Sequence, residues 1–209
     1  MAYTQNPLTF EVKNTAEKIS PRQLDIINAS GKLLTSKGSS GLTIKNLAKS
    51  MKFSEAALYR HYRSKEGIIV SMLEFLASEL DNHFNAMDKS KKPNERFLDY
   101  NKCQIDYFKA NPHFVTVAFS DGLFDSTDKI NNAIAGVGTV LQKHLIPIIM
   151  DGKLDNTFPM EVHSEKIVHI LLATSKLHMS KWRLSNYTSD LERTGMDMSE
   201  TMLNIFKKN

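Results

Sequence analysis

The stretch SEAALYRHYRSKEG, residues 54–67, decides the fold of this chain because it contains two helix starts around a basic, aromatic segment. The Ser54 hydroxyl can accept a backbone N–H from the first turn of a helix that begins at Glu55. Ser64 can cap a second helix, entered at Lys65, in the same way. The side chains between the caps are too polar and too numerous to be buried together, so we expect a contact surface formed by Tyr59, Arg60, His61, Tyr62 and Arg63.

A second short helix precedes this stretch. Thr43 can cap residues Ile44–Met51, whose apolar members recur at helical spacing. Two short helices joined by a turn form a helix-turn-helix, and the second helix, Glu55–His61, is then placed to enter a DNA major groove. Phe53 is the natural plug between the helices, whereas Lys52 occupies a turn position that favours glycine, at a cost of about 1 kcal/mol. The alternative interpretation is a solvated helix corner.

Residues 20–70 resemble the DNA-binding domain of the TetR/AcrR family of bacterial transcription regulators. The resemblance rests on a glycine, a threonine cap, a serine turn and a Leu-Tyr-x-His-aromatic-x-Ser-Lys-Glu run. The matching residues are Ile27, Ala29, Leu33, Leu34, Gly38, Thr43, Ile44, Leu47, Ala48, Phe53, Ser54, Leu58, Tyr59, His61, Tyr62, Ser64, Lys65 and Glu66. Lys52 departs from the family's turn glycine. The same run also looks like the nucleoid-occlusion branch of the family, which binds DNA and a cell-division protein rather than a drug.

Composition and charge agree with a DNA-binding head on a larger body. The 209 residues, 41% hydrophobic and 24% charged, fit one compact unit or a small domain fused to a larger one. From Lys18 to Glu66 ten basic residues face three acidic ones, a local charge of +7 within a net charge of +4. A positive field confined to the first third of the chain is typical of a phosphate-binding head, although a solvated basic face has the same composition.

The sequence favours a cytoplasmic, nucleoid-associated protein. No run of eighteen or more apolar residues is present, and the N-terminus lacks a signal-peptide pattern, so we expect neither a membrane span nor export. The single cysteine, Cys103, cannot form an intrachain disulfide and is expected to fill the core rather than sense redox state.

Helical periodicity continues to the C-terminus, and no strand pattern interrupts it. We therefore predict an all-α protein of about nine helices, with an N-terminal three-helix helix-turn-helix domain and a C-terminal helical bundle domain. The predicted divisions are an N-terminal arm at residues 1–19, a DNA-binding domain at 20–66, and a ligand-binding and dimerisation domain at 67–209. The helix from Lys65 to about Met87 would join head and body as a lever. Pro147 should kink the end of the seventh helix before a loop at Asp151–Pro159.

No motif supports an enzyme. The sequence has no HExxH, no Cys/His ligand set, no phosphate-binding glycine loop and no GxSxG, so we expect no catalytic site, no metal and no cofactor. Three hypotheses from different classes are a ligand-responsive transcription regulator, a DNA-binding division protein without a small ligand, and an enzyme. A closed apolar cavity in the body would favour the first hypothesis over the second.

The family resemblance guides the expected DNA contacts. Phosphate contacts are expected mainly from Tyr59, His61, Tyr62 and Lys65, because tyrosine hydroxyls and lysine suit the DNA backbone. Base contacts are expected from Lys45 and from Glu55 and Ala56 in the first turn of the helix Glu55–His61, called the reading helix below. Contact of alanine methyl groups with bases and the shape of the DNA are expected to contribute to specificity. The full expected set is Thr43, Lys45, Ser54, Glu55, Ala56, Tyr59, Arg60, His61, Tyr62 and Lys65.

The resemblance also implies a homodimer on a near-palindromic operator and release of the DNA by a small, largely apolar ligand. Aromatic and flexible side chains of the body are available to line a ligand cavity, although they can equally fill the core: Phe84, Cys103, Tyr107, Phe108, Phe114, Phe119, Phe124, Met150 and Thr174. Helices eight and nine carry apolar residues on more faces than one core uses. They are therefore expected to form a four-helix dimer interface centred on Met202 and Leu203.

Overall fold

The computed structural model of the chain describes residues 19–119 and 127–206. Within these residues it contains nine helices and no strand, so the all-α prediction is confirmed. The helices are α1 (Pro21–Gly41), α2 (Ile44–Met51), α3 (Glu55–Tyr59), α4 (Lys65–Asn85), α5 (Pro93–Ala110), α6 (His113–Phe119), α7 (Asp128–Leu154), α8 (Ser164–Leu184) and α9 (Leu191–Phe206). Phe124 and residues 1–18 of the expected arm lie outside the described part of the chain.

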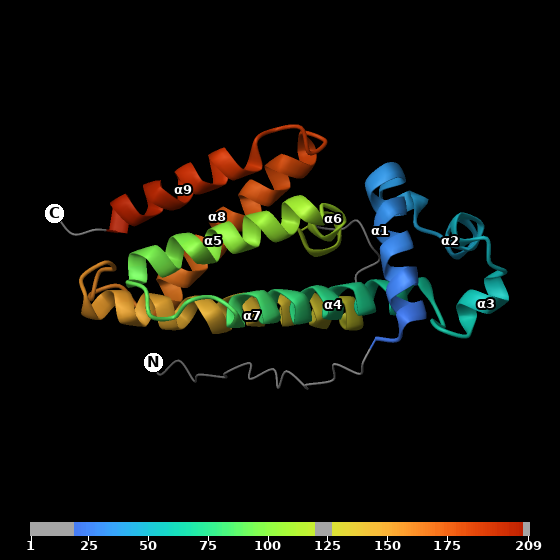
Figure 1. Ribbon diagram of the computed structural model, residues 1–209, viewed down its shortest axis with the longest axis horizontal. Coiled ribbons are helices and arrows are strands. Elements are labelled where there is room, and N and C mark those ends of the chain that lie inside the picture. The colour runs from blue at the N-terminus through green and yellow to red at the C-terminus, as the bar shows by residue number, and fades with distance from the viewer. Residues whose placement is uncertain (1–18, 120–126, 207–209) are drawn as a thin grey trace, which may run out of the picture.

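The helices form a small head and an elongated body. Figure 1 shows α1, α2 and α3 gathered at one end, while α4 leaves this head and runs along the body beside α7. The contact between α4 and α7 is the most extensive between any two helices of the described chain. A second link joins head to body where α6 packs on α1. The reading helix is therefore connected to the body both along the chain and through space.

The start of α1 is fixed by a capping box. Ser20 caps the helix, its hydroxyl accepting the Gln23 backbone N–H at 3.3 Å, and the Gln23 side chain bonds back to the Ser20 backbone N–H at 3.0 Å. This reciprocal capping box satisfies two donors that the first turn leaves unpaired. Towards the other end Gly38 adopts φ 68° and ψ −170°, which interrupts the helical backbone of α1.

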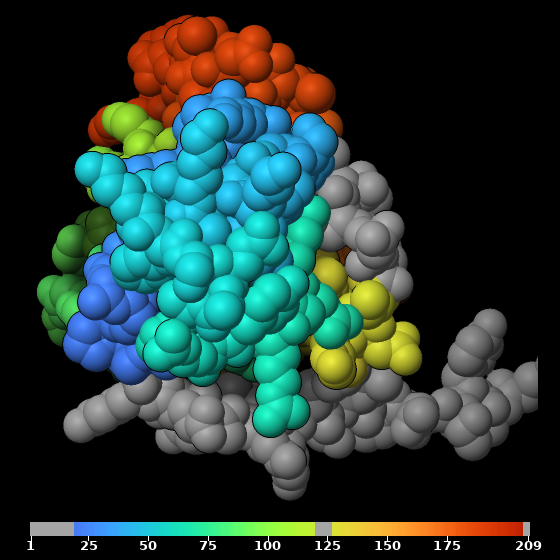
Figure 2. All heavy atoms as spheres, turned by 90° about the vertical axis from the view of Figure 1, so that its right-hand side faces the viewer, coloured from blue at the N-terminus to red at the C-terminus, as the bar shows by residue number. Residues whose placement is uncertain are grey.

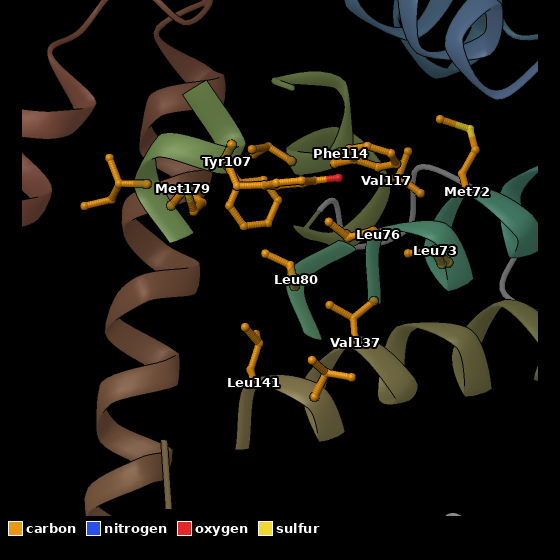
Figure 3. Close-up of a cluster of buried hydrophobic side chains, with 14 of the residues drawn as sticks. Met72, Leu73, Leu76, Leu80, Tyr107, Phe114, Val117, Val137, Leu141 and Met179 are labelled. Carbon is orange, nitrogen blue, oxygen red and sulfur yellow. The ribbon is translucent and has the colours of Figure 1, made fainter. Parts of the chain in front are cut away.

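The body core forms where α4 to α8 meet (Figure 3). Leucines and a methionine of α4 face aromatic and β-branched side chains of α5, α6 and α7 across the same space, with Met179 of α8 beside them. Phe84 stacks on Tyr100 with ring centroids 4.5 Å apart, and the buried Tyr100 hydroxyl donates to the Leu141 carbonyl at 3.1 Å. The core is thus a packed aromatic and aliphatic interior, which holds α4 firmly among its neighbours.

The seventh helix is longer than the sequence suggested. It continues past Pro147 to Leu154, so the expected loop at Asp151–Pro159 begins later than predicted. Proline removes one backbone hydrogen bond, but the turns beyond it are held by burial of Ile148 and Ile149 and by Phe158, which packs directly on Gly152. Tertiary packing here outweighs the local effect of the proline.

By length and composition, α7 is the one described helix that could also span a bilayer. It packs against α4, α5 and α8, as a core helix of a helical bundle does. Such a helix passes the same composition test as a membrane span, and its charged and amide side chains interrupt the apolar run that the sequence search required.

The last two helices expose an apolar stripe. Ile170, Leu177 and Leu184 on α8 are exposed and lie seven residues apart, and Met198 and Ile205 on α9 repeat that spacing. Residues seven apart lie on the same face of a helix. Met202 and Leu203, expected at the centre of a dimer interface, are instead buried in the chain's own core. The free apolar face is therefore offset from the predicted one.

Candidate nucleic-acid interface

The helix-turn-helix begins with the predicted threonine cap. The Thr43 hydroxyl accepts the Asn46 backbone N–H at 3.1 Å, and the Asn46 side chain donates to the Gly41 carbonyl at 2.9 Å. Thr43 itself has extended backbone angles, φ −126° and ψ 153°, so α2 starts abruptly. The chain between α1 and α2 is thus fixed at both ends.

Lys52 forms the turn in the left-handed conformation that glycine usually provides. Its φ is 56° and its ψ 39°, and its backbone N–H donates to carbonyls at the end of α2. The Phe53 N–H follows by donating to the Ala48 carbonyl at 2.9 Å. These bonds satisfy carbonyls that the helix end would otherwise leave unpaired. Lys52 therefore makes the turn less favourable in free energy than glycine would, but the turn keeps the same backbone geometry.

Phe53 fills the position between the helices that the sequence assigned to it. Its ring is partly buried against the core, and the Arg22 guanidinium carbon lies 5.1 Å from the ring centroid. A guanidinium at this distance from an aromatic face is attracted to it. Arg22 of α1 thereby holds the turn that sets the angle between α2 and α3.

The reading helix α3 is shorter than predicted. The Ser54 hydroxyl accepts the Ala57 N–H at 3.1 Å, and Leu58 is fully buried beneath the helix. Regular helix ends at Tyr59, after which the N–H groups of His61 and Tyr62 both bond to the Leu58 carbonyl, at 2.9 and 3.0 Å. His61 thus lies in the turn after α3 and not on the helix.

Most of the expected DNA-contacting residues lie exposed on the head. Figure 2 views the molecule from this end, where α2, α3 and the turn that follows form the surface facing the reader. The exposed members of the set are Thr43, Lys45, Ser54, Glu55, Ala56, Tyr59, Arg60 and His61, with Tyr59 49% exposed. The basic residues Lys49, Lys52 and Arg63 are also exposed on the head, and the local charge was the signal that pointed to them.

Tyr62 has a different place from the one predicted. Its side chain is only 7% exposed, and its hydroxyl lies 2.9 Å from Ser71 Oγ on α4. Burial raises the pKa of this phenol, partly offset by the Ser71 hydrogen bond. Tyr62 therefore cannot offer its hydroxyl to a phosphate in this conformation. The aromatic ring is needed where α3 turns into α4, and this need outweighs its polar character.

Lys65 is half-buried at the start of α4. Its ammonium donates to the Ser39 carbonyl at 3.5 Å, in the segment after the break in α1. The Ser64 hydroxyl beside it caps α4 by accepting the Gly67 N–H at 3.1 Å. Lys65 thus links the lever helix to α1 in addition to any role at the DNA.

The side chains expected to line a ligand cavity do not surround one space. Phe84, Tyr107, Phe108 and Phe114 are buried in the core, and Phe119 packs on Phe108 with centroids 5.3 Å apart. Among the other predicted residues, Cys103 and Tyr107 border an open groove of about 640 Å³ between α4 and α5, which also carries Glu79, Asp99, Lys102 and Asp106.

Elsewhere in the described chain, Phe84 and Thr174 border two separate voids of about 30 Å³ each, whereas Met150 is 56% exposed on the surface. The aromatic rings pack on one another instead of leaving a gap. No closed cavity large enough for a drug-sized apolar ligand, which needs about 300 Å³ or more, is found among the described residues in this conformation.

Ion pairs fasten α4 to α7 at two places. Near the head, Lys129 Nζ lies 3.2 Å from Glu66 Oε2. Four turns further along α4, Asp81 Oδ1 lies 2.7 Å from Lys143 Nζ and 2.6 Å from His144 Nε2. Burial alone would raise the pKa of Asp81, but the hydrogen bonds from Lys143 and His144 outweigh it and lower that pKa. If α4 tilts, it must either break these ion pairs or move together with α7.

Cys103 and the possible metal ligands also bear on whether the chain has a reactive centre. Burial raises the pKa of the Cys103 thiol to about 11, so it is protonated at neutral pH and a poor nucleophile. Among the described residues, no three His, Cys, Asp or Glu side chains lie close enough together to hold a metal ion.

A capped helix-turn-helix on a basic head, joined by a long helix to an all-helical body, defines the class of helix-turn-helix DNA-binding regulators. Residues 26–72 match the family model described as "Bacterial regulatory proteins, tetR family". Residues 26–72 are therefore a tetR-family DNA-binding domain at the head of the chain.

Individual relatives and solved structures extend the likeness to the body. The chain is 24% identical over 171 residues to the nucleoid occlusion factor SlmA of Shewanella pealeana, covering 81% of this chain and 86% of that protein. The TetR-family regulator PfmR of Thermus thermophilus has a TM-score of 0.71 at 23% identity, covering 86% of this chain and 97% of PfmR. The regulator FadR of Bacillus subtilis, solved with stearoyl-CoA, has a TM-score of 0.70 at 14% identity, covering 87% of this chain and 96% of FadR. The solved structures share the fold of this chain.

Proposed function

We propose that the protein is a homodimeric transcription repressor that binds a near-palindromic operator and is released from it by a small, largely apolar ligand. The observation that carries the proposal is the exposed face of α3 on a basic head. We assign DNA binding to residues 20–66 and ligand binding with dimerisation to residues 67–209. A repressor of this kind works on DNA in the cytoplasm, at the nucleoid, and needs no catalytic group.

The geometry of the head supports a particular division of labour at the DNA. The first turn of α3 carries only small or acidic side chains, Ser54, Glu55 and Ala56, so its backbone can approach base edges closely. Tyr59 lies exposed at the other end of α3, and His61 is exposed in the turn that follows it, where hydroxyl and imidazole can reach phosphates. Lys45 lies exposed on α2, beside the reading helix.

The apolar stripe on α8 and α9 supports the dimer. Five exposed apolar side chains at heptad spacing on two neighbouring helices match the face that a four-helix bundle buries when two subunits pair. A two-fold pair of heads then matches two half-sites about 34–36 Å apart on DNA.

The lever helix supports regulation by a ligand. Since α4 joins the reading helix to the body core, tilting it changes the separation of the two heads. A hundredfold loss of operator affinity requires about 2.7 kcal/mol of coupling, and DNA must then weaken ligand binding by the same factor. A fold neighbour solved with stearoyl-CoA supports an apolar ligand. The packed core of this chain means that side chains must move to admit one.

A second candidate is a DNA-binding protein of the nucleoid-occlusion kind, which would bind a protein partner and no small ligand. Two observations favour it: the 24% identity to SlmA over 86% of that protein, and the lack of a closed, drug-sized cavity among the voids found in the described residues. Under this proposal the body would be a docking platform and not a ligand receptor.

One experiment tests the DNA-binding proposal and separates the two candidates. Duplexes selected from random DNA by the purified protein would be measured by fluorescence anisotropy at fixed salt, with Tyr59→Ala as the test variant and Gln142→Ala, exposed on α7, as control. We expect near-palindromic sequences and a weakened Tyr59→Ala complex. Apolar compounds that raise the melting temperature would then be added. Loss of the DNA complex favours the repressor, and retention with every stabilising compound favours the second candidate.

A further inference from the structure

A void of about 30 Å³ lies where α5, α8 and α9 meet, away from the aromatic core. A space of this size holds about two water molecules. Its walls combine apolar side chains, Phe97, Leu171 and the methionines Met179, Met198 and Met202, with the polar side chains of Gln104, Ser175 and His178. Polar groups of this number are unusual between packed helices, because each needs a hydrogen-bond partner.

Gln104 is the unusual residue in this wall. Its side chain is 1% exposed, and its Oε1 accepts a hydrogen bond from Ser175 Oγ at 2.6 Å. The buried Nε2 group of the same amide has no hydrogen-bond partner within the described protein. A buried donor without an acceptor is unfavourable, so the position is expected to be filled by an acceptor from outside the chain.

The acceptor must belong to a neutral molecule. His178 lies in the same wall with its Nε2 2.9 Å from Thr194 Oγ1, and burial together with Lys181 lowers its pKa, which keeps the ring neutral at pH 7. Among the described residues, no charged side chain lines the void. An ionised ligand group placed there would lose its hydration without gaining an opposite charge.

The walls of the void differ in how readily they can move to admit a guest. Between α5 and α9 the backbone of Gly195 lies close to the side chain of Ile105, since a Cβ added at Gly195 would lie 2.6 Å from Ile105 Cδ1. Three methionines also line the void, Met179 from α8 and Met198 and Met202 from α9, and their unbranched side chains can adapt to a guest. Met198 is partly exposed and belongs to the apolar stripe of α9, so it marks the route from the surface.

We propose that this void is the polar end of a binding site for a neutral molecule with one carbonyl oxygen and a short apolar chain. The oxygen accepts a hydrogen bond from Gln104 Nε2, and the chain displaces Met198 and Met202 between α8 and α9. The inference rests on the proposed function and deepens it, because a guest in this position moves the two helices assigned to the dimer interface. The ligand signal then reaches the heads through the dimer geometry as well as through α4.

The test uses three compounds with the full-length protein carrying ¹³C-methyl methionine. The compounds are 2-heptanone and N,N-dimethylhexanamide, which offer a carbonyl acceptor only, and hexanoate, which is charged. We expect saturable shifts of the Met179, Met198 and Met202 methyl signals with the two neutral compounds and none with hexanoate. Gln104→Leu should weaken binding of the neutral compounds by about fivefold or more, because their oxygen then lacks a buried donor. The control Gln142→Leu, exposed on α7, should bind as the parent does.

Shifts confined to Met72 and Met87 beside the aromatic core would overturn the proposal, as would equal affinity in Gln104→Leu or tight binding of hexanoate. If Gln104→Leu fails to fold, the proposal is tested by the methyl shifts of the parent protein and by the affinity of Ser175→Ala for the neutral compounds. Ser175→Ala removes the hydrogen bond that holds the Gln104 amide, so it should weaken binding as well. Operator binding is measured separately by anisotropy on selected DNA. A protein that binds no duplex refutes the proposed function, whereas the methyl shifts decide the site independently.

Discussion

Lys52 must adopt a left-handed backbone conformation because of its place in the turn. Its left-handed backbone is required to close the corner between α2 and α3, and a side chain at φ 56° is disfavoured there relative to glycine. The lysine is exposed, so its charge remains available to DNA on a basic head. Stability and DNA affinity therefore oppose each other at this position.

Replacing Lys52 with glycine tests the backbone strain in this turn. We expect Lys52→Gly to raise the free energy of unfolding by about 0.5–1 kcal/mol, since relief of the left-handed strain exceeds the entropy that glycine adds to the unfolded chain. Urea denaturation of the parent and the variant measures the difference. Lys52→Ala, which keeps the strain and removes the charge, serves as control and should not be stabilised. A destabilised glycine variant would contradict the strain.

Tyr59 and Tyr62 are neighbours in sequence with opposite environments. Tyr59 is exposed on the reading face, whereas the Tyr62 hydroxyl is bonded to Ser71 inside the head. We expect Tyr62→Phe to lower the free energy of unfolding by about 1 kcal/mol and to leave operator affinity unchanged. Tyr59→Phe should show the reverse pattern. Urea denaturation measures the stability, and gel-shift titrations at fixed salt measure the operator affinity. A large loss of operator affinity in Tyr62→Phe would indicate that the Tyr62 hydroxyl contacts a phosphate after all, and would contradict this prediction.

His113 couples pH to stability at the contact between head and body. Its ring packs on Gly31 of α1, and burial lowers its pKa to about 4 from the usual value of about 6.5. A lowered histidine pKa means that the unfolded chain binds the proton first, so this contribution is complete above pH 6.5 and is lost as pH falls towards 4.

Between pH 7 and pH 5 we therefore expect the parent protein to lose up to about 2 kcal/mol of stability through His113. Denaturation at both pH values should show a smaller loss in His113→Gln than in the parent. The control variant is His61→Gln, exposed on the head, which should lose as much as the parent. An equal pH slope in parent and His113→Gln would contradict the assignment.

At the scale of elements, caps and periodicity predicted most of the fold. Thr43, Ser54 and Ser64 each cap the helix that the sequence assigned to them, because capping depends on residues within one turn. The extent of α7 past Pro147 could not be predicted, since distant residues hold its last turns. Nor could the burial of Tyr62, which depends on Ser71 of the next helix.

The candidate sites likewise include features that local sequence predicts and features that depend on packing between distant residues. The exposed face of α3 follows from local sequence, so eight of the ten expected DNA residues lie exposed on the head. Whether aromatic side chains line a cavity or fill a core depends on how the helices of the body meet, which no local pattern specifies. The buried Gln104, without a partner for its amide nitrogen in the described chain, became visible only through packing.

The exposed stripe of α8 and α9 yields an element-scale prediction. Leu177 lies at its middle on α8 and is 58% exposed, so Leu177→Glu should leave the subunit folded while placing a charge in the proposed interface. We expect sedimentation at micromolar concentration to give a dimer for the parent and a particle of about 23.7 kDa for the variant. Gln142→Glu, exposed on α7, is the charge-matched control and should stay dimeric. A dimeric Leu177→Glu protein would exclude this face.

At the scale of the whole molecule, the proposed regulator consists of two subunits, each with a basic head and a helical body. Each head gains affinity mainly from phosphates, and specificity arises when both heads engage one duplex. The ion pairs between α4 and α7 and the contact of α1 with α6 make head and body move together. Any ligand that shifts the body then changes the distance between heads, whether it acts along α4 or across the dimer.

The most direct test of the central claim is hydroxyl-radical footprinting of the protein on a duplex selected from random DNA. The account predicts two symmetric zones of protection with centres about one helical turn, or roughly 10 base pairs, apart, both lost in Leu177→Glu and weakened in Tyr59→Ala. A single protected zone that persists in Leu177→Glu, or protection that does not depend on Tyr59, would contradict it.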